Sequence, residues 1–239
     1  CTATTISLDP AHSRSTQATV PTTLAGASVV LRQHQRVKDA LPVAAFRATN
    51  NAATADRLLF YDPNISTYRT LWLFLNGGNR KWVLQGDTSL ADAGGRVINA
   101  TEGFYVHSRT AATSVPVYGV VRVNDCACPL LAGANFIGAF WATSQSPVGR
   151  AMTIANGFAG STIQSNADRI RVWNGDTSSS QAYTGYYLLK TPSLERWVRE
   201  GDTSLADQSN NQIFSAYRAA FIQCKAARTL WKPVSPVTP

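Results

Sequence analysis

Short runs of apolar and aromatic residues, separated by turn-forming residues, dominate the chain. The clearest runs are residues 57–61, 70–75, 103–107, 115–123 and 182–189. They are rich in β-branched and aromatic side chains, which suit a pleated, half-buried surface. Strands that recur about every 8–12 residues are typical of β-sandwiches and β-barrels. The pattern therefore predicts an all-β fold.

One segment of this pattern occurs twice. Residues 82–92 read Trp-Val-Leu-Gln-Gly-Asp-Thr-Ser-Leu-Ala-Asp, and residues 197–207 read Trp-Val-Arg-Glu-Gly-Asp-Thr-Ser-Leu-Ala-Asp. Nine of the eleven positions are identical, at a constant offset of 115 residues. Repetition of this kind is typical of tandem structural units, and it favours a repeated folding unit over a single catalytic centre.

The match extends beyond this segment on both sides. Its other paired positions are 24–27 with 131–134, Asp56-Arg57 with Asp168-Arg169, Tyr61 with Trp173, Tyr68 with Tyr183, Ile98 with Ile213, and Val106 with Phe221. Each copy is thus about 100 residues long, the size of a small domain. We predict two tandem β-sandwich repeats, jelly-roll-like or immunoglobulin-like, at 22–124 and 125–227. An extended N-terminal leader (1–21) and a Pro-rich tail (228–239) lie outside them.

The end of the second copy is ambiguous in the sequence. Residues 215–225 (Ser-Ala-Tyr-Arg-Ala-Ala-Phe-Ile-Gln-Cys-Lys) also fit a short helix. The repeat aligns them with residues 103–106, whose composition predicts a strand. We therefore predict a strand in both copies.

Charge and hydropathy limit the kinds of molecule that the chain is expected to bind. The net charge is +8 and the pI is about 9.6, but the arginines and lysines are scattered. Ordinary solvated charge is the favoured interpretation, with contact to an anionic polysaccharide or a cell surface as the alternative. No nucleic-acid-binding motif is present, so specific recognition of nucleic acid is not predicted. The sequence contains no run of 18 apolar residues, so no transmembrane segment is predicted.

The four cysteines are Cys1, Cys126, Cys128 and Cys224. An even number of cysteines in a chain that starts with Cys fits a processed, exported protein with up to two disulfides. Two cysteines separated by one residue are poorly placed to bond to each other, so we expect Cys126 or Cys128 to pair with Cys224 or Cys1. The alternatives are buried thiols and, less favoured on spacing, a zinc site. Lipidation of Cys1 is a further open alternative.

Candidate catalytic chemistry is sparse. The three histidines, His12, His34 and His107, have no counterpart in the second copy, where Ile222 aligns with His107. No metalloprotease, nucleophile-elbow or dinucleotide-binding pattern occurs. We therefore predict no enzyme, and no catalytic, cofactor or metal residue, while a hydrolytic triad assembled in space stays a remote alternative.

The repeated carboxylates are Asp87, Asp92, Asp202 and Asp207. An aspartate followed by Thr and Ser can accept hydrogen bonds from its own backbone and fix a turn. A calcium loop or acid–base pair is the alternative, but the alternating acidic residues that calcium loops use are absent. We predict a structural turn, built the same way twice.

Trp82 and Trp197 occupy equivalent positions directly before this turn. Equivalent large aromatics in two copies are more often core residues than exposed platforms for sugars. We predict that both are buried, and keep a sugar-stacking surface as the alternative.

The ordered pattern resembles a poorly characterised class of secreted β-repeat surface proteins of planctomycete- and verrucomicrobia-like bacteria. In that class, each unit opens with a Leu-x-x-Gly-x-Asn-Leu-type segment, matched here by residues 131–138, and closes with a Gly-aromatic segment, matched by 102–106. The second copy departs from the pattern at its end, where residues 218–222 replace the Gly-aromatic segment. The resemblance implies an exported surface protein and supplies no reaction or catalytic residue.

The leader completes the prediction. Its first residues include small and apolar side chains that suit the edge of a sheet, namely Thr2, Ala3, Ile6 and Leu8, and Pro10 then ends the strand. We expect this strand to pair with another subunit. The predicted function is thus an exported structural protein that polymerises into an extracellular fibre or surface layer. A carbohydrate-binding or adhesin module is the first alternative, and a secreted hydrolase is the second.

Overall fold

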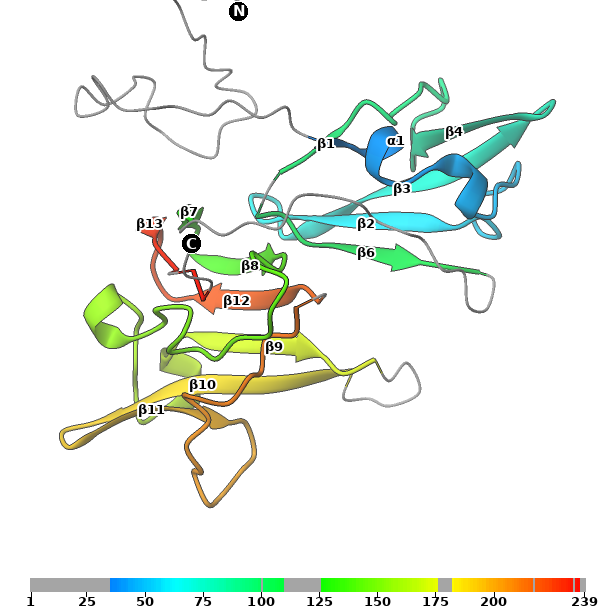
Figure 1. Cartoon of the computed structure of the whole chain (residues 1–239). Helices are drawn as coiled ribbons and strands as arrows, with labels where there is room; N and C mark the ends of the chain where they lie inside the picture. Colours follow the sequence, from blue (N-terminus) through cyan, green and yellow to red (C-terminus); the bar gives the residue numbers. More distant parts are fainter. Residues whose placement is uncertain are drawn as a thin grey trace, which may run out of the picture.

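The computed structural model of the chain describes residues 35–99, 101–109, 126–175, 182–216, 218–233 and 235–236. In these ranges β-strands dominate, and the only α-helix is the four-residue α1 (Val37–Ala40) (Figure 1). Three single turns of 3-10 helix accompany it: η2 (Val43–Ala45), η3 (Ile154–Asn156) and η4 (Gln164–Asn166). The predicted all-β class is confirmed.

The first unit, residues 35–109, is built on an antiparallel sheet in the order β4-β3-β2-β6. Its strands are β2 (Arg57–Asp62), β3 (Thr67–Asn76), β4 (Asn79–Leu84) and β6 (Phe104–His107). A two-stranded pair, β1 (Gln35–Arg36) with β5 (Val97–Ile98), lies beside α1. The β3–β4 hairpin turns at Gly77 and Gly78, whose φ angles of 55° and 87° are those that a two-residue hairpin turn of this hand requires.

The second unit, residues 126–233, is built on a five-stranded antiparallel sheet in the order β11-β10-β9-β12-β8. Its strands are β8 (Gly133–Ile137), β9 (Arg169–Trp173), β10 (Tyr183–Thr191), β11 (Leu194–Arg199) and β12 (Ala220–Cys224). A two-stranded pair, β7 (Cys128–Leu130) with β13 (Arg228–Trp231), packs beside it.

The two units share one framework, in which β2, β3, β4 and β6 correspond to β9, β10, β11 and β12. A buried aspartate before the first of these strands holds each framework together. Asp56 accepts hydrogen bonds from the amides of Arg47 (2.8 Å) and Arg109 (2.6 Å). Asp168 does the same for the amides of Ala159 (2.8 Å) and Lys225 (2.7 Å).

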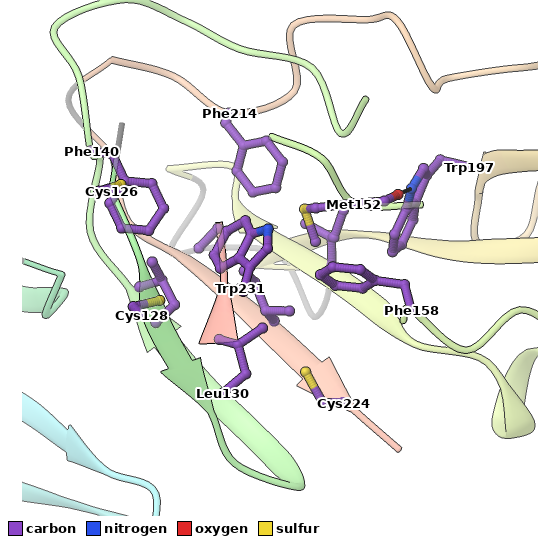
Figure 2. Packing of buried hydrophobic residues seen from close by; sticks show 14 of the residues in the cluster. Cys126, Cys128, Leu130, Phe140, Met152, Phe158, Trp197, Phe214, Cys224 and Trp231 are labelled. Atoms are coloured by element: carbon purple, nitrogen blue, oxygen red, sulfur yellow. Dashed lines mark hydrogen bonds between the residues drawn. The ribbon is translucent and has the colours of Figure 1, made fainter. Parts of the chain in front are cut away.

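Each sheet has an apolar core on one face and a smaller cluster on the other. The first unit's core contains Val37, Leu41, Phe46, Leu58, Phe60, Leu71, Leu73 and Trp82. The second unit's core is larger because residues of β7, β8 and β13 close over it (Figure 2). Burial of such apolar surface is the main stabilising contribution in both units.

The tail predicted at 228–239 begins inside this second core. Trp231 of β13 is 2% exposed and lies edge-on against Phe140 and Phe158, with ring centroids 5.3 and 6.1 Å away. Its indole N–H donates to the carbonyl of Arg150 (2.8 Å), and the Pro233 carbonyl accepts from the Cys126 amide. Residues 228–233 therefore belong to the second unit.

The ends of the two frameworks match with one change from the sequence alignment. The strand predicted within 215–225 is confirmed as β12. However, Val106 pairs with Leu58 as Ile222 pairs with Ile170, so Val106 corresponds to Ile222 and not to Phe221. By the same register His107 corresponds to Gln223, and Tyr105 to Phe221. The sequence alignment of β6 with β12 was wrong by one residue, because these strands are short and β12 has no glycine that matches Gly103 and would fix its position.

Candidate functional site

The most distinctive surface of the molecule lies where the two sheets meet. Seven aromatic rings form it, and we call it the aromatic joint: Tyr61, Tyr68 and Tyr105 of the first unit with Phe136, Trp173, Tyr183 and Phe221 of the second. Tyr105 stacks on Phe136 with ring centroids 4.5 Å apart, and Tyr61 lies edge-on to Phe221 at 5.1 Å. Tyr105 also lies edge-on to Trp173 at 6.1 Å. Contacts of these geometries add to the stabilisation that area burial alone provides.

The backbone reinforces this joint just before β6. The Gly103 amide donates to the Phe136 carbonyl (3.2 Å), and the Gly138 amide donates to the Thr101 carbonyl (3.1 Å). Residue 103 has no room for a side chain, because a Cβ added there would lie 2.7 Å from the Cβ of Ala219. The two units are therefore held together by main-chain hydrogen bonds as well as by ring contacts.

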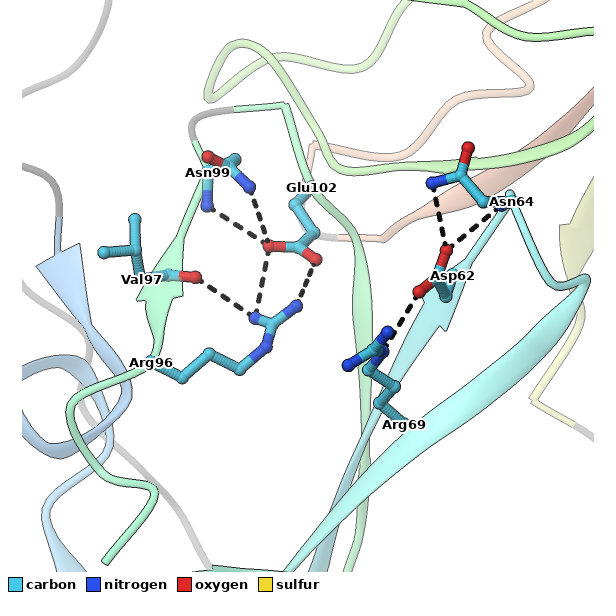
Figure 3. A network of polar contacts seen from close by, with 7 residues as sticks. All are labelled: Asp62, Asn64, Arg69, Arg96, Val97, Asn99 and Glu102. Atoms are coloured by element: carbon cyan, nitrogen blue, oxygen red, sulfur yellow. Dashed lines mark hydrogen bonds and ion pairs between the residues drawn. The ribbon is translucent and has the colours of Figure 1, made fainter. Parts of the chain in front are cut away.

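A bidentate ion pair fixes the segment that carries Gly103. The Glu102 carboxylate accepts from both terminal nitrogens of Arg96 (2.6 and 3.2 Å) and from the Asn99 amide (3.2 Å) (Figure 3). The Arg96 guanidinium also lies 3.6 Å from the centre of the Phe60 ring. Because Glu102 is buried, this pairing positions the residue next to the joint with little freedom to move.

The hydroxyl groups of the joint bond to each other. The Tyr105 and Tyr183 hydroxyl oxygens are 2.6 Å apart. Burial, followed by the neighbouring tyrosine hydroxyls, raises the pKa of Tyr105 and of Tyr68 well above the usual tyrosine value. These phenols therefore stay protonated at neutral pH and act as hydrogen-bonding groups and not as proton acceptors.

An open hollow of about 970 Å³ lies beside Tyr183 on the second sheet. Its lining is mainly polar: Gln164, Arg171, Asn174, Ala182, Tyr183, Thr184, Gly185, Arg199, Glu200 and Gly201. The Glu200 side chain crosses over Gly185 and accepts from Nε of Arg169 (2.5 Å). Arg171 stands opposite Gly185 in the register and is exposed. The hollow can offer a cation and amide groups to an anionic or hydroxyl-rich ligand.

The repeated aspartates lie in the same turn in both units. Asp87 accepts from the amide and hydroxyl of Ser89 (2.9 and 2.7 Å), and Asp202 accepts from those of Ser204 (2.9 and 2.6 Å). Hydrogen bonds from these serines, chiefly from their hydroxyls, lower the pKa of Asp87 and Asp202. Both carboxylates thus accept bonds from their own turn.

The second pair of repeated aspartates also bonds locally. Asp92 accepts from the Gly94 amide and Asp207 from the Ser209 amide, both at 2.8 Å. The structure therefore does not bring the carboxylates of Asp87 and Asp92, or those of Asp202 and Asp207, together in one site. Among the described residues, no group of three or more His, Cys, Asp or Glu is placed to hold a metal ion.

Trp82 and Trp197 lie in matching positions within the two cores, each 1% exposed. The Trp197 indole N–H donates to the Met152 carbonyl (2.7 Å), and that of Trp82 makes a longer bond to the Leu41 carbonyl (3.4 Å). Neither ring is available for stacking against a sugar.

Cys126, Cys128 and Cys224 are all buried in the second core, and no disulfide joins any two of them, so the predicted bond from Cys126 or Cys128 to Cys224 is not formed in this structure. Cys1, His12, His34 and the leader residues Thr2, Ala3, Ile6 and Leu8 lie outside the described residues. The predicted bonds to Cys1 and the leader's strand contact thus stay predictions. His107 is exposed at the end of β6.

Two features escaped the sequence analysis. The paired Asp56 and Asp168 were visible as repeated Asp-Arg dipeptides, but nothing in the sequence showed their burial. Arg150 had no repeated signal. It is 1% exposed, its guanidinium lies 4.0 Å from the centre of the Phe214 ring, and its Nε donates to Gln145 (3.2 Å). Burial lowers the pKa of Arg150 to about 10.

Comparison with known proteins gave no match, whether to protein families, to curated proteins or to solved structures. The resemblance to secreted β-repeat proteins therefore stays a prediction. No helix in the described part of the chain is long and apolar enough to cross a membrane.

Proposed function

We propose that this chain is an exported, non-enzymatic structural protein, a subunit of an extracellular fibre or surface layer. In this proposal it consists of two tandem β-sandwich units, and copies join through β-strand contacts. The export part of the proposal is based on the β-rich sequence and its cysteines.

The observation that carries the proposal is the use of the repeated residues. Asp87 and Asp202 close the same turn, and Trp82 and Trp197 fill the same core position. Asp56 and Asp168 accept equivalent backbone bonds. What duplication preserved is thus a framework, as expected for a building block whose role is mechanical.

Electron microscopy of the purified full-length protein tests this function directly. We expect the wild-type chain to form fibres or sheets. A chain without residues 1–20 should still fold but should form no fibres or sheets, because the deletion removes the candidate donor strand Thr2–Leu8. Isolated particles of the wild-type chain under all conditions would contradict the proposal. Mass spectrometry of unreduced protein tests the disulfides separately, and unbonded thiols at all four cysteines would weaken the assignment to an extracellular compartment.

The hollow beside Tyr183 favours the second candidate, a carbohydrate-binding or adhesin module. Arg171 in the hollow corresponds to Leu59 in the first unit, so this surface changed while the framework did not. Binding of acidic oligosaccharides that Arg171→Leu abolishes, by isolated particles, would support the module over the fibre. For the third candidate, a secreted hydrolase, no described residue set stands out, and screening for hydrolytic activity would test it.

A further inference from the structure

The two sheets end differently at equivalent strands. In the second unit, β12 is paired on both sides, by β9 and by β8. In the first unit, the equivalent strand β6 pairs with β2 on one side, and it is the last strand of its sheet among the described residues. The backbone groups on the outer edge of such a strand are a template for a further strand.

An exposed apolar side chain on β6 indicates that a neighbouring strand is missing at this edge. Val106 of β6 is 46% exposed, whereas its counterpart Ile222 is fully buried. The described core of the first unit holds eight buried residues against sixteen in the second. Much of the difference comes from β7, β8 and β13, for which the described part of the first unit has no equivalent. An additional strand beside β6 would cover Val106.

The sequence contains a counterpart of β8. Residues 24–27 and 131–134 are both Leu-Ala-Gly-Ala, at an offset of 107 residues, so residues 26–30 (Gly-Ala-Ser-Val-Val) correspond to Gly133–Ile137. These residues lie outside the described part of the chain. Since Asn135 stands opposite Ile222 in the second sheet, Ser28 would stand opposite Val106 in the first.

The connection after this segment decides which copy supplies it. In the second unit, seven residues, 138–144, separate β8 from the bridge between Gln145 and Phe214. In the first unit, only four residues, 31–34, separate residue 30 from β1. Shortened connections favour exchange of a strand between copies, because a short hinge strains the path by which a strand folds back onto its own sheet.

We propose that the outer edge of β6 accepts residues 26–30 of a second copy of this chain as the fifth strand of the first sheet. Ser28 of one copy then lies opposite Val106 of its neighbour. The inference rests on the proposed function and adds a second strand contact between copies, beside that of the leader strand Thr2–Leu8. It also places the leader, residues 1–21, along the neighbouring subunit.

Disulfide trapping of the predicted register provides the test. A Ser28→Cys chain with one affinity tag is mixed with a Val106→Cys chain with another, under mild oxidation. We expect a covalent dimer that carries both tags, with the two introduced cysteines joined in its tryptic peptides. Ser28→Cys mixed with Ile65→Cys is the matched control, because Ile65 is an exposed apolar residue (58%) in the turn between β2 and β3. This pair should give at least tenfold less dimer.

A second pair of variants tests the edge without any cysteine. Val106→Lys places a charge on the edge and should reduce the sedimentable fraction at least tenfold, whereas Ile65→Lys should leave it unchanged. Because both residues are exposed in the single chain, both variants should melt close to the wild-type temperature.

The outcomes separate the two proposals. Fibres of the wild-type chain without the trapped dimer would overturn this inference and leave the proposed function standing. A bond that forms only within one Ser28→Cys/Val106→Cys chain would overturn it too, because the strand would then come from the same copy. A wild-type chain that never assembles would overturn both.

Discussion

Trp82 and Trp197 fill equivalent core positions, but their indole N–H groups are bonded differently. At 2.7 Å the bond from Trp197 to the Met152 carbonyl is short, and at 3.4 Å the bond from Trp82 to Leu41 is long. We expect Trp→Ala at either site to lower the free energy of unfolding by about 3–5 kcal/mol. Trp→Phe should separate them: about 1–3 kcal/mol at Trp197, where a buried carbonyl loses its donor, and less at Trp82. Urea unfolding measures both, and equal losses would contradict the interpretation.

Asp168 gives a second prediction for a single residue. Asp168→Ala leaves the Ala159 and Lys225 amides without their acceptor, so the free energy of unfolding should fall by about 1–3 kcal/mol for each donor. Asp62→Ala is the control. Asp62 pairs with the exposed Arg69 and accepts from the exposed Asn64 amide, whose lost acceptor water can replace, so we expect a loss of about 0–1 kcal/mol. If chemical denaturation shows similar losses for the two variants, Asp168 does not hold the framework as described.

Sequence analysis at the residue scale found positions better than environments. It located Trp82 and Asp87 as repeated residues, since identity at nine of eleven positions is easy to detect. It did not find the burial of Arg150, because that environment is built by Phe140, Phe214 and Gln145, none of which forms a motif with it. Contacts of this kind depend on the tertiary fold and leave no local pattern.

At the scale of the element, the repeated turn after β4 and β11 should respond to acid. Its hydrogen bonds lower the pKa of Asp202 in the folded chain, so its contribution to stability is present above the unfolded-state pKa and is lost as the pH falls through the folded one. Asp202→Asn should therefore lower the melting temperature at pH 7, and the difference from wild type should shrink below about pH 4.

The control for this prediction is Asp39→Asn, which removes the same charge from an exposed residue of α1. This variant should melt like the wild type at pH 7. If the difference between Asp202→Asn and wild type stays constant down to pH 2, the carboxylate is not what stabilises the turn.

Strands were predictable where the repeat was long and uncertain where it was short. The strands on either side of the repeated segment follow from apolar residues at matched positions, because alternation survives duplication. The repeat alignment placed the final strand, β12, one residue out of register with β6. A shift of one residue matters, because it moves every side chain to the other face of the sheet. Only the pairing of Val106 with Leu58 and of Ile222 with Ile170 fixes it.

At the scale of the whole molecule, Gly103 controls how the units meet. Gly103→Ala would place a Cβ 2.7 Å from that of Ala219 and 3.2 Å from the backbone of Ile137, so we expect it to weaken the joint by about 1–3 kcal/mol. Calorimetry should then resolve separate melting of the two units. Gly95→Ala is the matched control, since a Cβ there would meet nothing within 4 Å. Unchanged melting of the Gly103 variant would contradict a joint that tight packing maintains.

The joint itself could not be predicted from the sequence. Its rings come from strands that are distant in the sequence, such as those of Tyr61 and Phe221, and each unit's aromatics serve its own sheet equally well. Which of them meet depends on how the two sheets dock.

The contacts in the joint come in matched pairs. Tyr61 corresponds to Trp173, and Tyr105 corresponds to Phe221 in the strand register. The contact of Tyr61 with Phe221 is therefore repeated, with the units exchanged, in the contact of Tyr105 with Trp173.

At the centre of these pairs, Gly103 faces Ala219, its own counterpart. This is the arrangement of an isologous interface about a pseudo-two-fold axis, so the chain is equivalent to a homodimer whose two subunits have been fused. An isologous interface is closed, because one partner saturates it. The aromatic face therefore cannot propagate a polymer, and any growth of a fibre must proceed through the remaining surfaces, of which the edge of β6 is one.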